Sequence, residues 1–182
     1  MLKNIIFDLG GVLLNIDYNK TEKAFQDLGF GEFNEMYNQY SSDAIFTRLE
    51  TGTISMDTFY EYMIHASNNN ISLEQINEAW NRMLLDFRVE SLNFLLQLAK
   101  RYQLYLISNT NAIHEKAFAE IFTKQTGQPS LGYYFNKSYY SHKLGLRKPN
   151  EDIFNFVLND AGLLVAESLF IDDSYNNINT AK

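Results

Sequence analysis

The 182-residue chain has no cysteine, only two prolines and no long apolar run. The absence of cysteine excludes disulfide frameworks, thiolate zinc sites and thiol catalysis. No stretch reaches the roughly 18 consecutive apolar residues of a transmembrane helix, and the apolar run at the N-terminus is too short for a signal peptide. We therefore expect a cytoplasmic protein with no membrane partner.

Positive charge is also scarce, because 15 Lys and Arg residues face 22 Asp and Glu residues and the net charge is -7. Such a chain offers no attractive field to a phosphate backbone, so nucleic acid is not an expected partner. What the chain does contain is 46% hydrophobic and 15% aromatic residues. This composition is typical of a packed globular protein of one domain, or of a core with an insertion.

Three short apolar runs are each followed at once by polar side chains. The runs and their polar successors are 5–7 with Asp8, 104–107 with Ser108 and Asn109, and 169–171 with Asp172 and Asp173. Runs of this kind are typical of strands buried on both faces of a parallel sheet, and helical patterns lie between them. The sequence therefore predicts an α/β domain whose polar strand ends meet in one crevice.

Residues 18–86 differ, because helix follows helix without strand-like runs. Ser55 is an expected helix cap, and Ser72 with Gln75 forms a capping box before a helix that we expect to reach Leu84. The pattern predicts a helical bundle at 18–86, inserted into an α/β core made of 1–17 and 87–182. Its aromatic residues are expected to build the bundle's own core; they are Phe59, Tyr60, Tyr62 and Trp80.

The C-terminal half contains weaker signals. A helix is expected to place Ile153, Phe156, Val157 and Ala161 on one face and to stop at Gly162. The segment from about 124 to 147 has little periodicity and is expected to hold one short strand near Tyr139. The chain ends in the first turns of a helix, so we expect further residues in the complete protein.

The polar residues at the strand ends are suited to binding a phosphoryl group together with a hard cation. Mg²⁺ prefers oxygen ligands, commonly one or two carboxylates plus phosphate oxygens, and Asp8 with Asp172 or Asp173 would supply the carboxylates. Asp8 is the natural nucleophile, because a carboxylate that attacks phosphorus forms an acyl phosphate that water later cleaves. Ser108 and the backbone amides after it would hold the phosphoryl oxygens. Lys148 would add a positive charge.

Each assignment has a structural alternative. Asp8, Ser108 and the acid pair are also suitable helix caps or turn residues. Asn111 is as suitable a cap as a substrate contact. Lys143 competes with Lys148, and the flanking "RKP" favours the latter. The three histidines show no metal-ligand spacing and receive no role; they are His65, His114 and His142.

The segments "FDLGGVL", "LISNTN", "LGLRKPNEDIF" and "FIDDSYNNI" resemble the four motifs of the haloacid dehalogenase superfamily, in order and over nearly the whole chain. Together with "LETGTISMDTF", they are most similar to the bacterial sugar phosphatases typified by α-D-glucose-1-phosphate phosphatase. The resemblance implies a Rossmann-like core with an inserted helical cap, Mg²⁺, and an aspartyl-phosphate intermediate. It also implies roles by position: Asp8 as nucleophile; Ser108, Asn109 and Lys148 at the phosphate; Asp8, the Gly10 carbonyl, Asp172 and Asp173 at the metal.

Gly10 departs from the pattern of most phosphatases in the superfamily, which carry there an aspartate that protonates the leaving oxygen and activates water. Glycine keeps the metal-binding carbonyl and loses the acid, although the similar sugar-phosphatase branch also has glycine. Because acid–base assistance contributes about 100- to 10,000-fold, a substrate with an acidic leaving group is favoured. Asp17 is the candidate substitute acid.

The sequence thus predicts a Mg²⁺-dependent phosphatase of small phosphomonoesters, with a sugar phosphate as the expected substrate. One alternative is a metal-independent hydrolase of the haloacid dehalogenase type. The pair Asp172 and Asp173 speaks against it, because two uncompensated acids would burden a site for a carboxylate substrate. The other alternative, motivated by Gly10, is a catalytically weakened binding protein.

Overall fold

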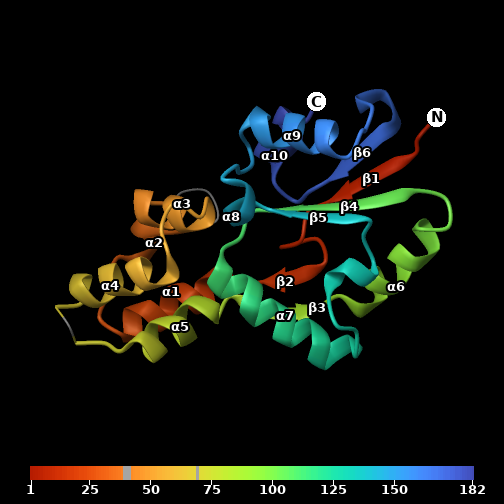
Figure 1. The fold of residues 1–182 in the computed structure, drawn as a ribbon. Coiled ribbons are helices and arrows are strands. Elements are labelled where there is room, and N and C mark those ends of the chain that lie inside the picture. Colours follow the sequence, from red (N-terminus) through yellow and green to blue (C-terminus); the bar gives the residue numbers. More distant parts are fainter. Residues whose placement is uncertain (39–41, 69) are drawn as a thin grey trace.

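The computed structural model describes residues 1–38, 42–68 and 70–182. These residues form a parallel four-stranded sheet of order β5-β4-β1-β6 (Figure 1). Its strands are β1 (Asn4–Phe7), β4 (Gln103–Ser108), β5 (Lys137–Tyr140) and β6 (Ser168–Ile171). β1 lies in the middle, with Phe7 opposite Leu106 on one side and Ile171 on the other. The predicted α/β fold is confirmed, and the short strand expected near Tyr139 is β5.

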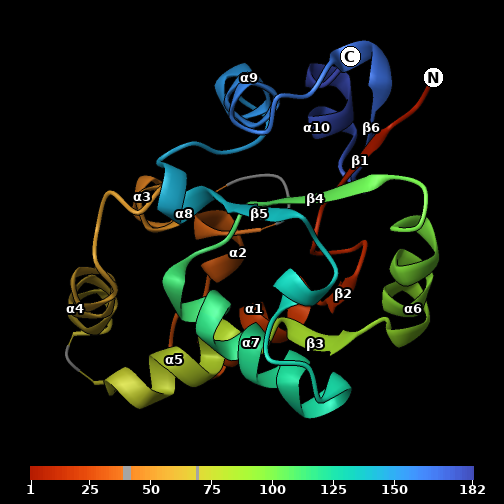
Figure 2. The ribbon, with the colours of Figure 1, turned by 45° about the vertical axis from the view of Figure 1, so that its right-hand side comes forward.

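Helices cover both faces of the sheet (Figure 2). The helices α9 (Glu151–Asp160) and α10 (Tyr175–Thr180) lie on one side, and α6 (Val89–Leu98) and α7 (Ala112–Thr126) on the other. Because side chains alternate along a strand, Ile6 packs with Ile153 of α9, whereas Ile5 belongs to the cluster on the opposite face. Of the residues expected on one face of this helix, Ile153 and Val157 are fully buried, whereas Phe156 is 38% exposed.

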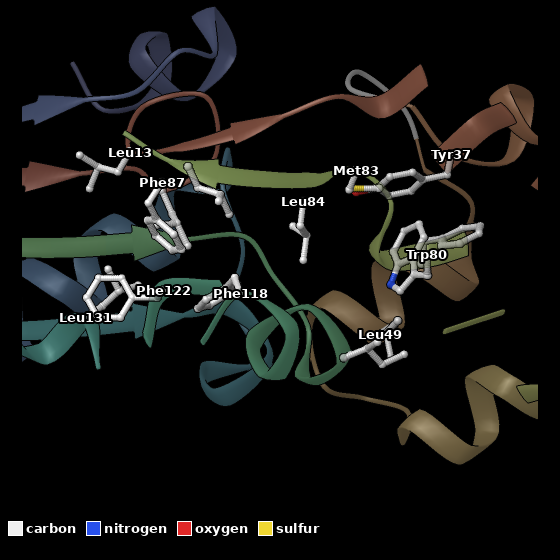
Figure 3. Close-up of a cluster of buried hydrophobic side chains, with 14 of the residues drawn as sticks. Leu13, Tyr37, Leu49, Trp80, Met83, Leu84, Phe87, Phe118, Phe122 and Leu131 are labelled. Atoms are coloured by element: carbon white, nitrogen blue, oxygen red, sulfur yellow. The ribbon is translucent and has the colours of Figure 1, made fainter. Parts of the chain in front are cut away.

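A helical insertion, residues 18–81, follows the first strand. Its helices are α1 (Tyr18–Asp27), α2 (Phe33–Met36), α3 (Ala44–Glu50), α4 (Met56–Ala66) and α5 (Leu73–Asn81). Ser55 caps α4 and the capping box of Ser72 and Gln75 begins α5, as predicted. Trp80 is fully buried in the aromatic core of the insertion (Figure 3). Of the aromatic residues expected there, Tyr62 is instead exposed.

Two short antiparallel strands, β2 (Leu14–Ile16) and β3 (Leu84–Phe87), connect the insertion to the sheet. The prediction that the helix of Trp80 continues to Leu84 is wrong, because α5 ends at Asn81 and Leu84 pairs with Ile16. Figure 3 shows Leu84 and Phe87 on this strand. The pairing partner is about 70 residues away in sequence, so local periodicity does not reveal the strand.

The remaining elements are short: the helix α8 (Ser141–Leu144) and the 3₁₀ turns η1 (Leu131–Tyr133) and η2 (Val165–Glu167). In the described part of the chain, none of the helices has both the length and the apolar character needed to cross a membrane.

Candidate active site

A cavity of about 950 Å³ opens between the carboxyl end of the sheet and the helical insertion. Its wall includes Asp8 after β1, Ser108 at the end of β4, and Asp173 after β6. Lys148 reaches the same place from the loop before α9. The structure therefore brings together polar residues that the sequence separates by up to 165 positions.

Lys148 is the centre of the charged network, with only 1% of its surface exposed. Its Nζ donates to Asp8 Oδ1 at 2.7 Å and to Asp172 Oδ2 at 2.5 Å. Burial alone would lower the pKa of Lys148, but the two carboxylates outweigh burial and raise it, so the ammonium stays charged. The competing Lys143 lies at the surface, where it pairs with Glu115.

Asp8 is buried directly beside this lysine. Burial raises the pKa of its carboxyl group to about 6; the charge of Lys148 opposes the shift and that of Asp172 adds to it. The backbone N–H of Asp8 donates to the Ile171 carbonyl at 2.8 Å, which fixes the residue against β6. An additional cation nearby would stabilise the charged form of this carboxylate.

The two acids after β6 have different environments. Asp172 accepts hydrogen bonds from the Ser174 N–H at 2.8 Å and from Asn177 Nδ2 at 2.9 Å, in addition to the bond from Lys148. Asp173 lines the cavity, and its pKa is raised by burial and by the neighbouring Asp172. Asp172 thus orients Lys148 and the loop, whereas Asp173 faces the open space.

Oxygen atoms of Asp8, Asp172 and Asp173 lie within 4.8 Å of one another. Three carboxylates gathered around one lysine leave net negative charge, and the donor atoms are all oxygen. That donor chemistry fits a hard divalent cation such as Mg²⁺. Gly10 also lines the cavity, so its position is compatible with the predicted carbonyl ligand.

Gly11 lies against Asp173 and was not identified from the sequence. Its φ angle is +74°, and a Cβ at this position would lie 2.2 Å from Asp173 Oδ2. Only glycine therefore allows the Asp173 carboxylate to approach the loop this closely.

The loop after β4 is held by hydrogen bonds between side chains and backbone groups. Asn109 Nδ2 donates to the Lys148 carbonyl at 2.8 Å, and Asn109 Oδ1 accepts from the Lys148 N–H at 2.9 Å. Ser141 Oγ accepts from the Thr110 N–H and donates to the Thr110 carbonyl, both at 2.9 Å. Ser108 lines the cavity, but the Asn109 amide is engaged in positioning Lys148. Phosphate binding by these residues stays a prediction.

Asn111 and Asp17 both have capping roles. Asn111 Oδ1 accepts from the N–H groups of Ile113 and His114 and begins α7. The Asp17 carboxylate accepts from the Asn19 N–H at 3.1 Å and begins α1. Asp17 is absent from the described residues that line the cavity, so its role as substitute acid is an untested prediction.

Sequence reasoning missed the part of the wall that the insertion supplies. Tyr18, Tyr37 and Glu50 line the cavity, together with Arg147 of the core. His114, to which no role was assigned, also lies there and stacks on Trp80 with ring centroids 4.6 Å apart. No local pattern marks these residues, because their position depends on how the insertion folds back over the sheet.

The profile of the haloacid dehalogenase-like hydrolase family matches residues 2–182. The chain belongs to this family. Among similar proteins is D-ribitol-5-phosphate phosphatase from Bacteroides thetaiotaomicron, 35% identical over 183 aligned residues that cover 100% of this chain and 88% of the relative. The family and the hydrolase class predicted from the sequence motifs are confirmed.

Solved structures of the same family are also similar to this chain. A variant of a haloacid dehalogenase family enzyme from Bacteroides thetaiotaomicron, in complex with magnesium and inorganic phosphate, has a TM-score of 0.92 at 35% identity, covering 100% of this chain and 89% of that one. A HAD-like family hydrolase from Porphyromonas gingivalis has a TM-score of 0.89 at 32% identity, covering 100% and 86%. A 2-haloacid dehalogenase from Pseudomonas syringae, covering 100% and 82%, is 20% identical with a TM-score of 0.61 and shares the fold.

Proposed function

We propose that this hydrolase is a Mg²⁺-dependent phosphatase of small phosphorylated sugars or polyols. The observation that carries the proposal is the buried Asp8 carboxylate, held 2.7 Å from Lys148 at the wall of a cavity and beside an acidic pair. The similarity to a D-ribitol-5-phosphate phosphatase and to a magnesium- and phosphate-bound enzyme supports the same chemistry.

Asp8, Asp173 and the carbonyl of Gly10 would hold the ion, with Asp172 beside them. When bound, Mg²⁺ neutralises negative charge on the phosphoryl oxygens. Lys148 contributes a second positive charge and is itself oriented by Asp172 and by the side chain of Asn109. The Ser108 hydroxyl and the N-terminal end of α7 are suited to the remaining phosphoryl oxygens.

In the proposed reaction, an Asp8 carboxylate oxygen attacks phosphorus and the bond between phosphorus and the ester oxygen breaks. The leaving oxygen takes a proton from solvent water and departs as the alcohol, and Asp8 carries the phosphoryl group as an acyl phosphate. Water then attacks this phosphorus, releases inorganic phosphate and restores the carboxylate. Gly10 provides no acid for the leaving oxygen, so an acidic leaving alcohol departs most easily.

We further infer that residues 18–86 act as a cap over a core formed by 1–17 and 87–182. The cavity has walls from both parts, which supports a cap that excludes water from the reacting groups. Residues 84–86 belong to β3, so the connecting strands form the boundary of such a cap.

The metal-independent dehalogenase reaction is the competing proposal. Three clustered carboxylates disfavour it, because a carboxylate substrate would add further negative charge beside them. The dehalogenases of known structure are 19–20% identical to the chain, a similarity that supports the fold and not the reaction.

We expect phosphate release from phosphorylated sugars and polyols with Mg²⁺, and its loss in EDTA. Asp8→Asn should lower kcat/KM by about 1,000-fold or more, because the nucleophile is removed. Asp27→Asn, which changes an exposed carboxylate on α1, is the matched control and should behave as the parent chain. Halide release from a 2-haloacid in EDTA, without phosphate release, would favour the dehalogenase instead.

A further inference from the structure

A second polar cluster lies in the cavity wall, contributed largely by the helical insertion. It consists of Tyr18, Tyr37, Thr47 and Glu50, with Arg147 from the core loop. Arg147 directly precedes Lys148, so the two clusters share one stretch of backbone. We call these five residues the cap-side cluster.

Glu50 is the most buried charged residue of the cap-side cluster, with 6% of its surface exposed. Its Oε1 accepts from the Tyr37 hydroxyl at 3.3 Å, and its Oε2 lies 3.0 Å from Arg147 Nη2. Arg147 Nη1 also donates to Thr47 Oγ1 at 3.2 Å. The pair therefore joins the end of α3 to the loop of the catalytic lysine.

This pair is not fully satisfied within the described residues. Arg147 Nε is buried and has no hydrogen-bond partner there, and Glu50 Oε2 has only its ion pair with Arg147 Nη2. Such groups cost free energy, and a buried ion pair is often no more stabilising than apolar residues of the same volume. Stability alone therefore does not explain why this ion pair is present. Its position in the cavity wall points instead to a role in binding a ligand.

Tyr18 connects the cap-side cluster with the reaction centre. It lines the same cavity as Asp8, Asp173 and Glu50, whose charges add to the rise that burial causes in its pKa. Its ring is 6.1 Å from that of Tyr37. A substrate whose phosphoryl group reaches Asp8 would share this cavity with Tyr18 and Glu50.

The charges of Glu50 and Arg147 balance, so the cap-side cluster offers no net attraction to a second charged group on the substrate. It offers both acceptors and donors, and a hydroxyl group is the substituent that uses both. Resting on the phosphatase function above, we propose that the cap-side cluster binds the leaving group and that Glu50 selects phosphate esters of polyhydroxylated alcohols. The 950 Å³ cavity has room for such a group beyond the phosphate.

The test compares two phosphate esters, D-ribitol 5-phosphate and 4-nitrophenyl phosphate, whose leaving group has no alcohol hydroxyls. Glu50→Gln should lower the ratio of their kcat/KM values about 10- to 100-fold, as expected for a hydrogen bond to a charged group. Tyr18→Phe, which removes one hydroxyl group, should lower the same ratio in the same direction. Glu61→Gln, on the exposed side of α4, is the control and should keep the parental ratio.

An unchanged ratio in folded Glu50→Gln would overturn the proposal, and so would an equal loss with both esters. If the parent chain cleaves neither ester, the phosphatase function fails. Calorimetric binding of D-ribitol 5-phosphate with Mg²⁺ then tests whether the cap-side cluster binds this compound. Weaker binding by Glu50→Gln than by Glu61→Gln would support it. Equal binding by the two variants would contradict it.

Discussion

At the scale of single residues, Gly11 shows how a missing side chain shapes the acidic site. The Asp173 carboxylate occupies the space that a Cβ of residue 11 would need, and the positive φ angle adds a second reason for glycine. A larger residue would have to displace Asp173 from the other two carboxylates. The spacing of the acids, and with it the affinity for a cation, therefore depends on residue 11 having no Cβ.

We expect Gly11→Ala to weaken Mg²⁺ binding by about 10- to 100-fold, the range found when groups that orient metal ligands are changed. Isothermal titration calorimetry measures this directly. Gly29→Ala is the matched control, because Gly29 also has a positive φ angle, +99°, but has no atom near the position of a Cβ. Equal Mg²⁺ affinities in the two variants would show that the contact with Asp173 is unimportant.

The residues that sequence reasoning found and missed differ in a physical way. Asp8, Ser108 and Asp173 follow apolar strands directly, so a parallel sheet places them at one edge whatever the details of packing. Glu50 and Arg147 meet only because α3 folds back onto the loop of Lys148. Such a tertiary contact has no local signature.

At the scale of elements, α5 and α7 meet through a buried histidine. His114 Nε2 lies 3.1 Å from the Trp80 carbonyl, and Nδ1 lies 3.2 Å from Asn111 Nδ2. Burial lowers the pKa of His114 to about 4, and the bond to the carbonyl opposes the shift only in part. The neutral imidazole thus joins a helix of the insertion to a helix of the core.

This depressed pKa predicts a pH dependence of stability. Between pH 6.5 and pH 4 the unfolded chain binds a proton at His114 that the folded chain does not, so stability falls as the pH is lowered. Urea unfolding should show His114→Gln gaining about 2 kcal/mol relative to the parent between pH 7 and pH 5. Other titrating groups, including Asp8, are common to both proteins and cancel in the difference. A constant difference would contradict the prediction.

Elements with strong local signals were predicted well, and those that depend on distant partners were not. The capping box at Ser72 satisfies the first amides of α5 with neighbouring side chains, so the sequence reveals where the helix begins. Its end at Asn81 is set by the pairing of Leu84 with Ile16.

At the scale of the whole molecule, one hydrophobic cluster runs from the insertion to the sheet. Phe25 and Trp80 of the insertion belong to the same cluster as Leu104 and Leu106 of β4. Figure 3 shows part of this cluster, with Trp80 of the insertion and Phe122 of the core. Since side chains from both parts fill one core, the loss of packing in either part should be felt in the other.

We expect Leu106→Ala to lower the free energy of unfolding by about 2–5 kcal/mol, the usual cost of such a cavity. Trp80 is the single tryptophan and lies in the insertion, so its fluorescence reports unfolding there. In urea, the transition in Trp80 fluorescence should coincide with the transition in the circular dichroism of the whole chain. Both transitions should move to lower urea concentration in Leu106→Ala. A Trp80 midpoint that does not move would mean that the two parts unfold independently.

The paired strands β2 and β3 are where the chain leaves the sheet and returns to it. The side chains of the insertion that line the cavity can change by mutation while the shared core stays packed and β1, which Asp8 follows, keeps its neighbours. Mutation and selection can thus change the substrate specificity while the residues proposed to perform the reaction stay in place.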